Sequence, residues 1–551
     1  MYKDGMKDFP SNSIQILPPH AHPARTWAFF LLGLAPLAFG CLAVWLGQDA
    51  NWDLRNYHWY NAYAFLNGRY AVDLLPSQTP WFYNPALDVP FYLLATHVPA
   101  VAAGFILGAV QGLNFILLFM LAYASLIIPD LRSKVIVCAA LSALGVLGGG
   151  GIAQIGTTFY DNVTSLGLFL SALLVMRNYD GLMQGALRKA FALAILCGLP
   201  AGMAMGLKLP CFTFCFGLCA AFWGTNGGWA RRLTISFAFG VGILFGVTLT
   251  LGHWAWFLQT HFGSPLFPYF NEVFKAPLAP LSSARDMQYV PRSLHDILLF
   301  PFIITISPFR AGEIPWRDLR IPILYMLLPL AIIARQLFGR GLERTSIIVP
   351  NLARYLLWAG VLSYFAWLIM FGIYRYAVPI EMIAPLLIVF ATDLVPTKPR
   401  VRVFFTAAIL VIVALTIQPG NWGRRSSWLD HFIEVDMPPL GDTSNLMLLM
   451  AGFEPYAHIA TQFPPEVPIV RIQSNFASPD QGKPINQVIN ERLDGHRGRF
   501  LILIPNWQHS FAADALRYFK LAADWKTCQI VRDHLFDDTV YDLCPVARVR
   551  E

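Results

Sequence analysis

Long apolar runs separated by short polar segments dominate the pattern of this chain. The runs are close to the roughly 20 residues that a helix needs to cross a hydrocarbon layer about 30 Å thick. Barrel strands would instead alternate over segments of about 10 residues, so helices are the spanning element that fits. The pattern predicts an α-helical polytopic membrane protein with about eleven transmembrane helices. We expect these spans near residues 27–47, 98–127, 135–154, 163–176, 190–208, 210–223, 233–258, 321–335, 354–373, 377–395 and 403–419.

Composition supports this interpretation, since 56% of the residues are hydrophobic and only 13% are charged. Soluble domains carry about 25% charged residues. The formal net charge of +7 does not indicate a nucleic-acid partner, because the basic residues lie in short segments between the apolar runs. There they set the orientation of the spans rather than form a binding face.

The basic segments alternate along the chain, which predicts its orientation. We expect the cytoplasmic segments to be those that contain Lys3, Lys7, Arg25, Arg132, Lys134, Arg177, Arg188, Lys189, Arg231, Arg232, Arg335, Arg340, Arg344, Lys398, Arg400 and Arg402. The alternate loop at 155–162 has no basic residue, and segment 48–97 has only Arg55 and Arg69. By the positive-inside rule, residues 1–26 form a cytoplasmic tail and the C-terminus is extracytoplasmic.

Three external segments are large: loops 48–97 and 259–320 within the membrane body 27–419, and the C-terminal segment 420–551. The last predicts a small α/β domain, with strands at 446–451, 467–472, 500–504 and 528–531 and helices near 455–462, 485–493 and 511–523. It has no glycine-rich nucleotide fingerprint. Cys528 and Cys544 would lie on the oxidising side, where a disulfide can form. The short apolar stretch 297–307 suits a re-entrant or surface-lying segment.

The first external loop holds the leading candidates for chemistry. Asp53 begins a predicted helix that runs to Asn67 and stops at Gly68. Asp53 is either the cap of that helix or a carboxylate at the membrane surface that accepts a proton from an attacking hydroxyl. Asp49 lies one turn earlier, where one carboxylate can raise the pKa of the other.

Aromatic and imidazole side chains follow directly. Tyr57 and His58 are candidate substrate-binding residues at the headgroup level. His58 near Asp53 is also a candidate metal ligand, although a hydrogen-bonding role fits its generic spacing better.

Other ionisable residues lie at the same predicted depth. Asp161 is expected to cap the fourth span, and Lys208 to end the fifth, either bound to a partner or snorkelling to the interface. Arg375 starts the tenth span, and Glu381 lies more than a turn inside it, as a site residue or one half of a structural ion pair.

Loop 259–320 adds two further candidates. Arg310 heads a charged patch with Glu313, Arg317, Asp318 and Arg320, which suits either phosphate binding or a solvated ion-pair cluster. Asn271 lies in a segment rich in proline and aromatic residues, which indicates an ordered interfacial loop.

The order of these segments resembles the GT-C superfamily of polyprenol-phosphate-sugar-dependent glycosyltransferases, and more narrowly the bacterial mannosyltransferase-like, glycosyltransferase family 87-like membrane proteins. The resemblance rests on the acidic first loop, the Asp161 loop, Gly206-Leu207-Lys208, the loop from Gly263 to Lys275, the segment Glu313–Arg320 and the segment Arg375–Glu381. It covers most of the chain. The first loop departs from the compact acidic pair of many relatives, which leaves open whether Asp49 or Asp53 is the base.

The resemblance implies an inverting sugar transfer at the outer face of a bacterial inner membrane, with no nucleotide sugar. Asp53 would be the general base, Asp161 a second acid, and Lys208 with Arg375 and Arg310 would bind the leaving phosphate. The partners would be a polyprenyl-phosphate sugar donor, a lipid, glycan or protein acceptor and membrane lipids. Some relatives need a divalent cation and others do not, so metal use stays open.

Two other classes of protein share parts of the pattern. A flippase or transporter for a lipid-linked or anionic substrate would also use an intramembrane Lys208 and Glu381. A polysaccharide polymerase or ligase would share the many spans and the loop arginines. The transferase hypothesis requires Asp53, Asp161, Lys208 and Arg375 to meet at one external site.

Overall fold

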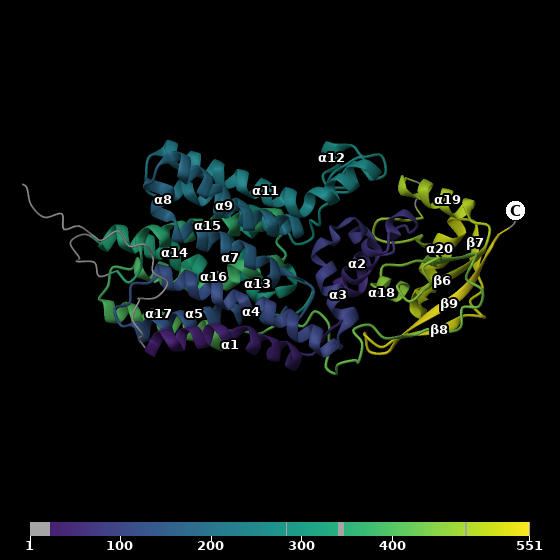
Figure 1. Cartoon of the computed structure of the whole chain (residues 1–551), viewed down its shortest axis with the longest axis horizontal. Helices are drawn as coiled ribbons and strands as arrows, with labels where there is room; N and C mark the ends of the chain where they lie inside the picture. Colours follow the sequence, from purple (N-terminus) through teal and green to yellow (C-terminus); the bar gives the residue numbers. More distant parts are fainter. Residues whose placement is uncertain (1–22, 283, 340–345, 480–481, 550–551) are drawn as a thin grey trace, which may run out of the picture.

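The structure is a computed structural model that describes residues 23–282, 284–339, 346–479 and 482–549. Most of the expected cytoplasmic tail, residues 1–26, lies outside the described residues. A long bundle of helices fills one side of the molecule and a smaller sheet domain lies at one end of it (Figure 1).

Among the described residues, eight helices are long and apolar enough to cross a membrane, and each coincides with one of the predicted spans. They are α1 (Pro23–Leu46), α4 (Ala100–Ser125), α9 (Leu187–Leu207), α11 (Trp229–Phe262), α14 (Arg320–Phe338), α15 (Pro350–Met370), α16 (Val378–Asp393) with the preceding turn η8 (Tyr374–Ala377), and α17 (Pro399–Thr416). The other three predicted spans are helical but shorter: α5 (Leu131–Val146), α7 (Asp161–Arg177) and α10 (Phe212–Ala220), which is flanked by the turns η5 (Leu209–Cys211) and η6 (Ala221–Gly224).

The helices differ in what surrounds them. Every residue of α16 is buried, so this helix forms the centre of the bundle. On the outside, α1 and α17 present large apolar side chains to the surroundings, with Trp45 and Leu415 each 80% exposed. A soluble protein rarely exposes such continuous apolar faces, whereas lipid chains would cover them.

Short elements at one end of the bundle make up the first external loop. They are β1 (Gln48–Asp49), the π-helical turn η1 (Leu54–His58), α2 (Trp59–Leu66), the turns η2 (Arg69–Ala71), η3 (Thr79–Phe82) and η4 (Pro85–Leu87), and α3 (Val89–His97). The predicted helix from Asp53 is present, and it ends as expected at Gly68, whose φ is +66°. The π-turn was not predicted. Such turns are rare in proteins, and those that occur are often found at functional sites.

The remaining short helices connect the spans. They are α6 (Gly149–Ala153), α8 (Tyr179–Gln184), α12 (Asn271–Phe274), α13 (Leu294–Ile306) and η7 (Pro308–Arg310). The predicted short apolar stretch is therefore a 13-residue helix, α13.

The C-terminal domain contains a seven-stranded mixed sheet in the order β3-β8-β9-β6-β4-β5, with β7 paired to β9. The strands are β3 (Val435–Asp436), β4 (Leu446–Met450), β5 (Ile469–Arg471), β6 (Arg499–Pro505), β7 (Leu521–Ala523), β8 (Gln529–Asp533) and β9 (Thr539–Arg548), and β2 (Arg424–Arg425) pairs with β1 in a separate sheet. The helices are α18 (Ala457–Ala460), α19 (Ile485–Gly495) and α20 (His509–Tyr518), with the turn η9 (Asn506–Gln508). The four predicted strands are confirmed.

The prediction of a helix over 511–523 was wrong at its end. Helix α20 stops at Tyr518, Lys520 takes a positive φ of 55°, and the chain then enters β7. Pairing with β9 holds this segment extended, with Ala522 opposite Ala547. The pattern of the segment alone does not show that partner.

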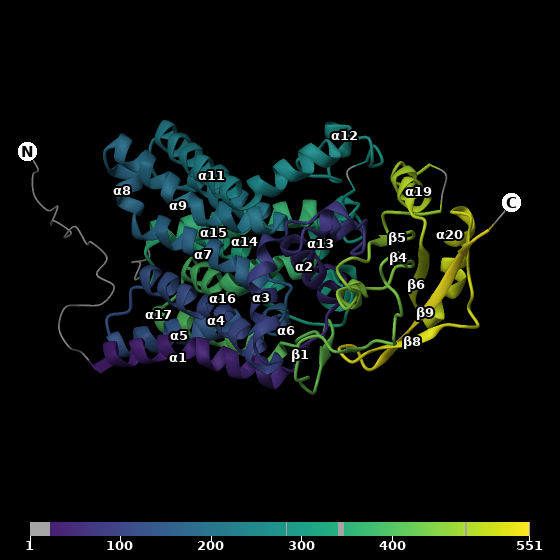
Figure 2. The ribbon, with the colours of Figure 1, turned by 45° about the vertical axis from the view of Figure 1, so that its right-hand side comes forward.

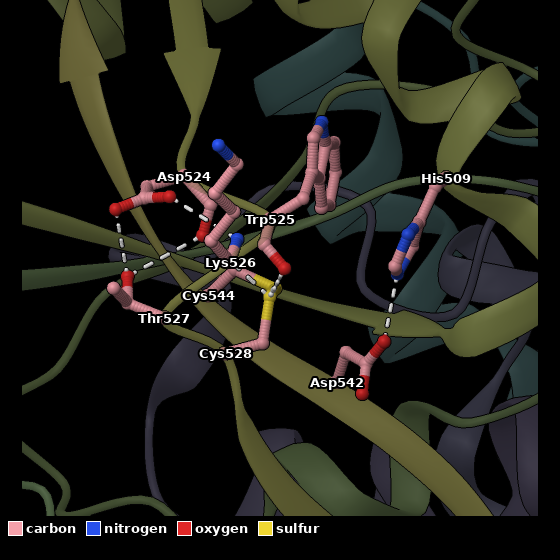
Figure 3. Close-up of a disulfide and its surroundings, with 8 residues drawn as sticks. All are labelled: His509, Asp524, Trp525, Lys526, Thr527, Cys528, Asp542 and Cys544. Atoms are coloured by element: carbon pink, nitrogen blue, oxygen red, sulfur yellow. Dashed lines mark hydrogen bonds and ion pairs between the residues drawn. A yellow bond between two sulfur atoms is a disulfide. The ribbon is translucent and has the colours of Figure 1, made fainter.

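The cysteines of the domain form a disulfide, Cys528–Cys544 (Figure 3). Cys528 comes directly before β8, and Cys544 lies in β9, the neighbouring strand of the same sheet. The bond therefore joins two adjacent antiparallel strands and confirms the pairing that the sequence suggested.

The sheet domain is built onto the first external loop. Leu74 forms a parallel bridge with Val470, which extends the sheet beyond β5. Asp73 accepts a hydrogen bond from the Ile469 amide at 2.9 Å and pairs with Arg69 at 2.6 Å. Side chains from the loop, such as Trp81, share one hydrophobic core with the sheet. The loop and the domain thus form a single packed unit.

The two ends of the bundle differ. Helix α8 lies at the end away from the sheet (Figure 2), and helix α9, which follows it, has Arg188 and Lys189 in its first turn. Helix α17 ends on the sheet side, where Gln418 bridges Arg317, so its first residues, which include Arg400, lie toward the other end. The charge distribution agrees with the predicted orientation, and the orientation itself stays a prediction.

Candidate active site

Two ion pairs meet at the end of the bundle that carries the sheet domain. Asp53 Oδ2 lies 2.9 Å from Arg375 Nη1, although the two residues are 322 positions apart. Lys208 Nζ lies 2.7 Å from Asp161 Oδ1. Their side chains are mostly buried but keep some contact with solvent, at 15% exposure for Asp53 and Lys208 and 11% for Arg375.

Two aromatic residues join these pairs into one group. The Arg375 guanidinium lies 4.4 Å from the centroid of the Phe159 ring, and Lys208 donates to the Phe159 carbonyl. The Tyr376 ring lies 5.3 Å from Lys208 Nζ and 5.9 Å from the Arg375 guanidinium. We call Asp53, Arg375, Asp161 and Lys208 the ion-pair cluster. Its four members are those that the sequence predicted to converge.

Each member of the ion-pair cluster lies at the end of an element. Asp53 precedes the π-turn η1, Asp161 is the first residue of α7, and Lys208 follows the last residue of α9. Arg375 lies in the turn η8 before α16. Polar residues are favoured at such ends, because a charged group further inside a span would lose its contact with water.

Neither acid caps a helix through its side chain. Asp53 is at the cap position of η1 but makes no side-chain cap hydrogen bond, so the cap alternative for Asp53 is not supported. The cap position of α7 belongs to Tyr160, in a left-handed conformation, so the prediction that Asp161 caps this helix was wrong. Both carboxylates are directed to cations instead.

Electrostatics keep Asp53 ionised. Burial alone would raise the pKa of Asp53, but the Arg375 guanidinium, together with His58 and Lys208, outweighs burial and lowers the pKa below its usual value. The carboxylate is therefore charged at neutral pH and can accept a proton.

His58 and Tyr57 lie beside Asp53 on the same segment. His58 Nδ1 lies 2.6 Å from Asp88 Oδ1, and its Nε2 is buried with no hydrogen-bond partner among the described residues. Burial raises the pKa of Asp88, and His58 partly offsets this rise. The Tyr57 ring packs edge-on against Tyr83, 5.2 Å between centroids.

The described part of the chain has no group of three or more metal-ligating side chains, so the metal-ligand alternative for His58 gains no support from neighbouring ligands. Asp88 was not predicted, because in the sequence it is only an acidic residue 30 positions after His58.

Asp49 does not join the ion-pair cluster. Its carboxylate accepts hydrogen bonds from the Thr158 amide and hydroxyl, both at 2.8 Å, and from the Asn51 amide and side chain. Burial raises the pKa of Asp49, and these hydrogen bonds counteract the rise. These contacts tie the first external loop to the segment before Asp161, and the backbone of Asp49 pairs with Arg424 in the β1–β2 sheet.

Glu381 is also engaged by the fold. It accepts hydrogen bonds from the amides of Gly150 and Gly151, at 3.0 and 2.7 Å, and from the Tyr374 hydroxyl at 2.6 Å. A Cβ atom on Gly148 would lie 1.9 Å from the Glu381 carboxylate, so the glycine segment and the acid pack directly together. Glu381 therefore holds helix α6 against α16, and the structure does not bring it to the ion-pair cluster.

The last two predicted residues also lie apart from the ion-pair cluster. The Asn271 side chain is buried; it donates to the carbonyls of Ala276 and Ala279 and accepts from the Ala276 amide, which orders its own loop. The Arg310 side chain is exposed and forms none of the ion pairs found in the described ranges.

Two further residues contact the ion-pair cluster: Glu313, which the sequence placed in the charged patch headed by Arg310, and Trp422, which was not predicted. Glu313 lies 3.6 Å from the second guanidinium nitrogen of Arg375, and the Trp422 indole donates to Glu313 at 2.9 Å. The Trp422 ring also packs edge-on against Phe159. The link between the C-terminal segment and the ion-pair cluster therefore passes through these two residues.

The helices, the sheet domain and the ion-pair cluster together define a polytopic helical protein of membrane type, with its charged groups gathered at one end of the bundle. No protein-family model matches the chain, and no curated protein matches it.

Proposed function

We propose that this protein is a membrane glycosyltransferase that moves a sugar from a polyprenyl-phosphate donor to an acceptor hydroxyl, with inversion, at the extracytoplasmic face of a bacterial inner membrane. The GT-C resemblance of the sequence motivates this assignment. The Cys528–Cys544 disulfide supports an oxidising location for the sheet domain, because structural disulfides persist on that side of the membrane.

One observation carries the proposal: an ionised carboxylate and two cations from three distant segments meet beside the sheet domain. Sugar transfer from a lipid phosphate requires these groups, namely an acceptor for the hydroxyl proton and positive charge for the leaving phosphate.

The proposed reaction assigns one role to each member. Asp53 takes the proton from the acceptor hydroxyl while its oxygen attacks the anomeric carbon. The bond between that carbon and the phosphate oxygen breaks, and polyprenyl phosphate leaves with the electron pair. Arg375 and Lys208 bind the phosphate and offset its growing charge.

In the free protein, Arg375 holds Asp53 at 2.9 Å. A phosphate that binds the guanidinium would therefore release the carboxylate for the acceptor. Asp161 positions Lys208, with its Oδ2 buried and unpartnered within the described ranges.

The test is an assay of purified protein, in proteoliposomes, with a panel of polyprenyl-phosphate sugars and cell-envelope extract as the source of acceptor. Released polyprenyl phosphate is measured by mass spectrometry. We expect Asp53→Asn to lower release at least about a hundredfold, since a positioned general base contributes about 10²–10⁴-fold. The matched control is Asp430→Asn, an exposed carboxylate in the same outer region.

The same variants separate the alternatives. Loss of product in Asp53→Asn, with unchanged protein level and unchanged flipping of the lipid carrier, supports the transferase. Normal product formation in Asp53→Asn would remove Asp53 from the mechanism and favour a polymerase or ligase that uses arginine or histidine. Loss of flipping instead of transfer would favour the transporter.

A further inference from the structure

A cavity of about 230 Å³ lies between the sheet domain and the start of the first external loop. Its walls come from three separate stretches: Ala50 from the loop, residues 421 and 423–425 from the segment that follows α17, and residues 535–537 from the turn between β8 and β9. None of these residues belongs to the ion-pair cluster.

Two links connect the cavity with the ion-pair cluster. Asn421 and Gly423 line the cavity, and Trp422 between them donates to Glu313, which lies 3.6 Å from Arg375. Ala50, which also lines the cavity, comes three residues before Asp53 in the chain. No member of the ion-pair cluster lines the cavity, so a molecule bound there leaves the position of the donor phosphate free.

Two arginines form a rigid wall of the cavity. Arg424 donates to the carbonyls of Gly47 and Ala153, at 3.2 and 2.9 Å. Burial lowers the pKa of Arg424 to about 10, so it stays protonated at neutral pH. Arg425 donates through Nε to Ser427 at 3.1 Å and through Nη1 to the His534 carbonyl, which fixes its guanidinium plane. Its Nη2 makes no hydrogen bond within the described part of the chain.

The opposite wall offers acceptors and an aromatic ring. Asp537 is exposed and forms no ion pair among the described residues. The Phe536 ring lines the cavity and has the Arg55 guanidinium 3.6 Å from its centroid, which holds the ring in place. Asn421 can both donate and accept.

This lining selects a chemical class of ligand. An inorganic phosphate is an anion at neutral pH, and the Asp537 carboxylate would repel it. A lipid chain would need apolar walls. Sugar hydroxyls both donate and accept, and the carbon–hydrogen face of a sugar packs on an aromatic ring. Pockets for drug-sized ligands measure about 300–1,000 Å³. A cavity of about 230 Å³ is smaller and suits one sugar unit.

We propose that this cavity binds one sugar unit of the acceptor, and that the acceptor is therefore a glycan. The inference rests on the proposed function, because it takes the bound sugar as part of the acceptor whose hydroxyl Asp53 deprotonates. It deepens that function by choosing a glycan over a lipid or a protein.

Saturation-transfer NMR tests the inference without turnover. The full chain in nanodiscs is titrated with the methyl α-glycosides of glucose, galactose, mannose, N-acetylglucosamine and glucuronic acid. We expect saturation transfer to at least one of these sugars. Losing a hydrogen bond to a charged group should then weaken binding at least about tenfold in Asp537→Asn and in Arg425→Gln.

The variants were chosen to leave the fold intact. Asp537 has a φ of +49°, a left-handed conformation that asparagine adopts readily. Asp430→Asn is the control, since Asp430 is exposed and does not line the cavity. Asp53→Asn should keep full binding, because Asp53 lies outside the cavity.

The outcomes separate the two claims. If none of the five sugars shows saturation transfer, or if both cavity variants bind like the control, the cavity is not a sugar site. If cavity-dependent binding is present but no polyprenyl phosphate is ever released, the sugar site stands and the transferase fails. If release occurs without cavity-dependent binding, the transferase stands and the acceptor binds elsewhere.

Discussion

The replacement Arg375→Met gives the most direct test of the ion-pair cluster. Methionine keeps much of the length of the side chain and removes its charge. At 2.9 Å and an effective dielectric constant of about 20, the attraction between Arg375 and Asp53 is about 6 kcal/mol before desolvation. Removing one partner of a buried ion pair lowers the free energy of unfolding by about 3–5 kcal/mol. We expect the lower part of that range, because Lys208 and His58 still face Asp53.

The replacement should also change the pH dependence of activity. In the native protein, Arg375 and its neighbours hold the pKa of Asp53 below the usual value of 3.8. The contribution of the pair to stability is therefore present above pH 3.8 and is lost as the pH falls through the lowered pKa. Without Arg375, burial becomes the dominant influence and raises the pKa of Asp53. The acid limb of kcat/KM should then move to higher pH.

The assay is polyprenyl phosphate release measured across the pH range from 3 to 8, with protein level and monodispersity checked at each pH. We expect the plateau rate of Arg375→Met to fall about 10²–10³-fold, the usual effect of removing one group that stabilises developing charge. Arg292→Met is the control, since Arg292 is exposed and forms no ion pair in the described ranges. An unshifted acid limb, or a plateau like that of the control, would refute the reasoning.

Two further predictions concern stability. Replacing both Cys528 and Cys544 by serine should destabilise the sheet domain by about 3 kcal/mol, the value for a closed loop of about 15 residues, as measured by limited proteolysis; an unchanged cleavage rate would contradict this. Glu381→Gln should lower the free energy of unfolding by about 1.5–3 kcal/mol. One of the two oxygens that accept from the Gly150 and Gly151 amides becomes an NH2 group, which cannot accept. Activity per folded molecule should stay near native, and its loss without loss of stability would instead assign Glu381 to substrate binding.

The spans could be predicted from the sequence because the constraint on them is local. A helix in lipid satisfies its own backbone, so an apolar run of sufficient length is enough evidence. The first helix of the external loop could also be predicted from local sequence, since Asp53 and Gly68 mark its ends. Segments whose conformation depends on a distant partner were harder. Strand β9 contains Pro545, which argues against a strand that is paired on both sides.

The candidate site was predictable in its membership but not in its contacts. The four members of the ion-pair cluster could be predicted because a charged side chain in or beside an apolar span is costly unless it has a partner or a function. Whether such a carboxylate caps its own helix or reaches a cation 322 residues away depends on the packing of the bundle. For the same reason Asp49 and Glu381 were predicted as site residues, although backbone amides donate hydrogen bonds to both carboxylates.

The bridge between Leu74 and Val470 has a consequence for the order of assembly. The loop that carries Asp53 leaves the ribosome early, yet the residue that completes its edge is made 396 positions later. At about 5–20 residues per second, synthesis of that stretch takes on the order of 20–80 seconds. Helices α4 to α17 are made during that interval, before the residues that complete the loop. A late stop codon within the sheet domain would therefore leave a chain with all its apolar helices but without the partner strand of the loop that carries Asp53.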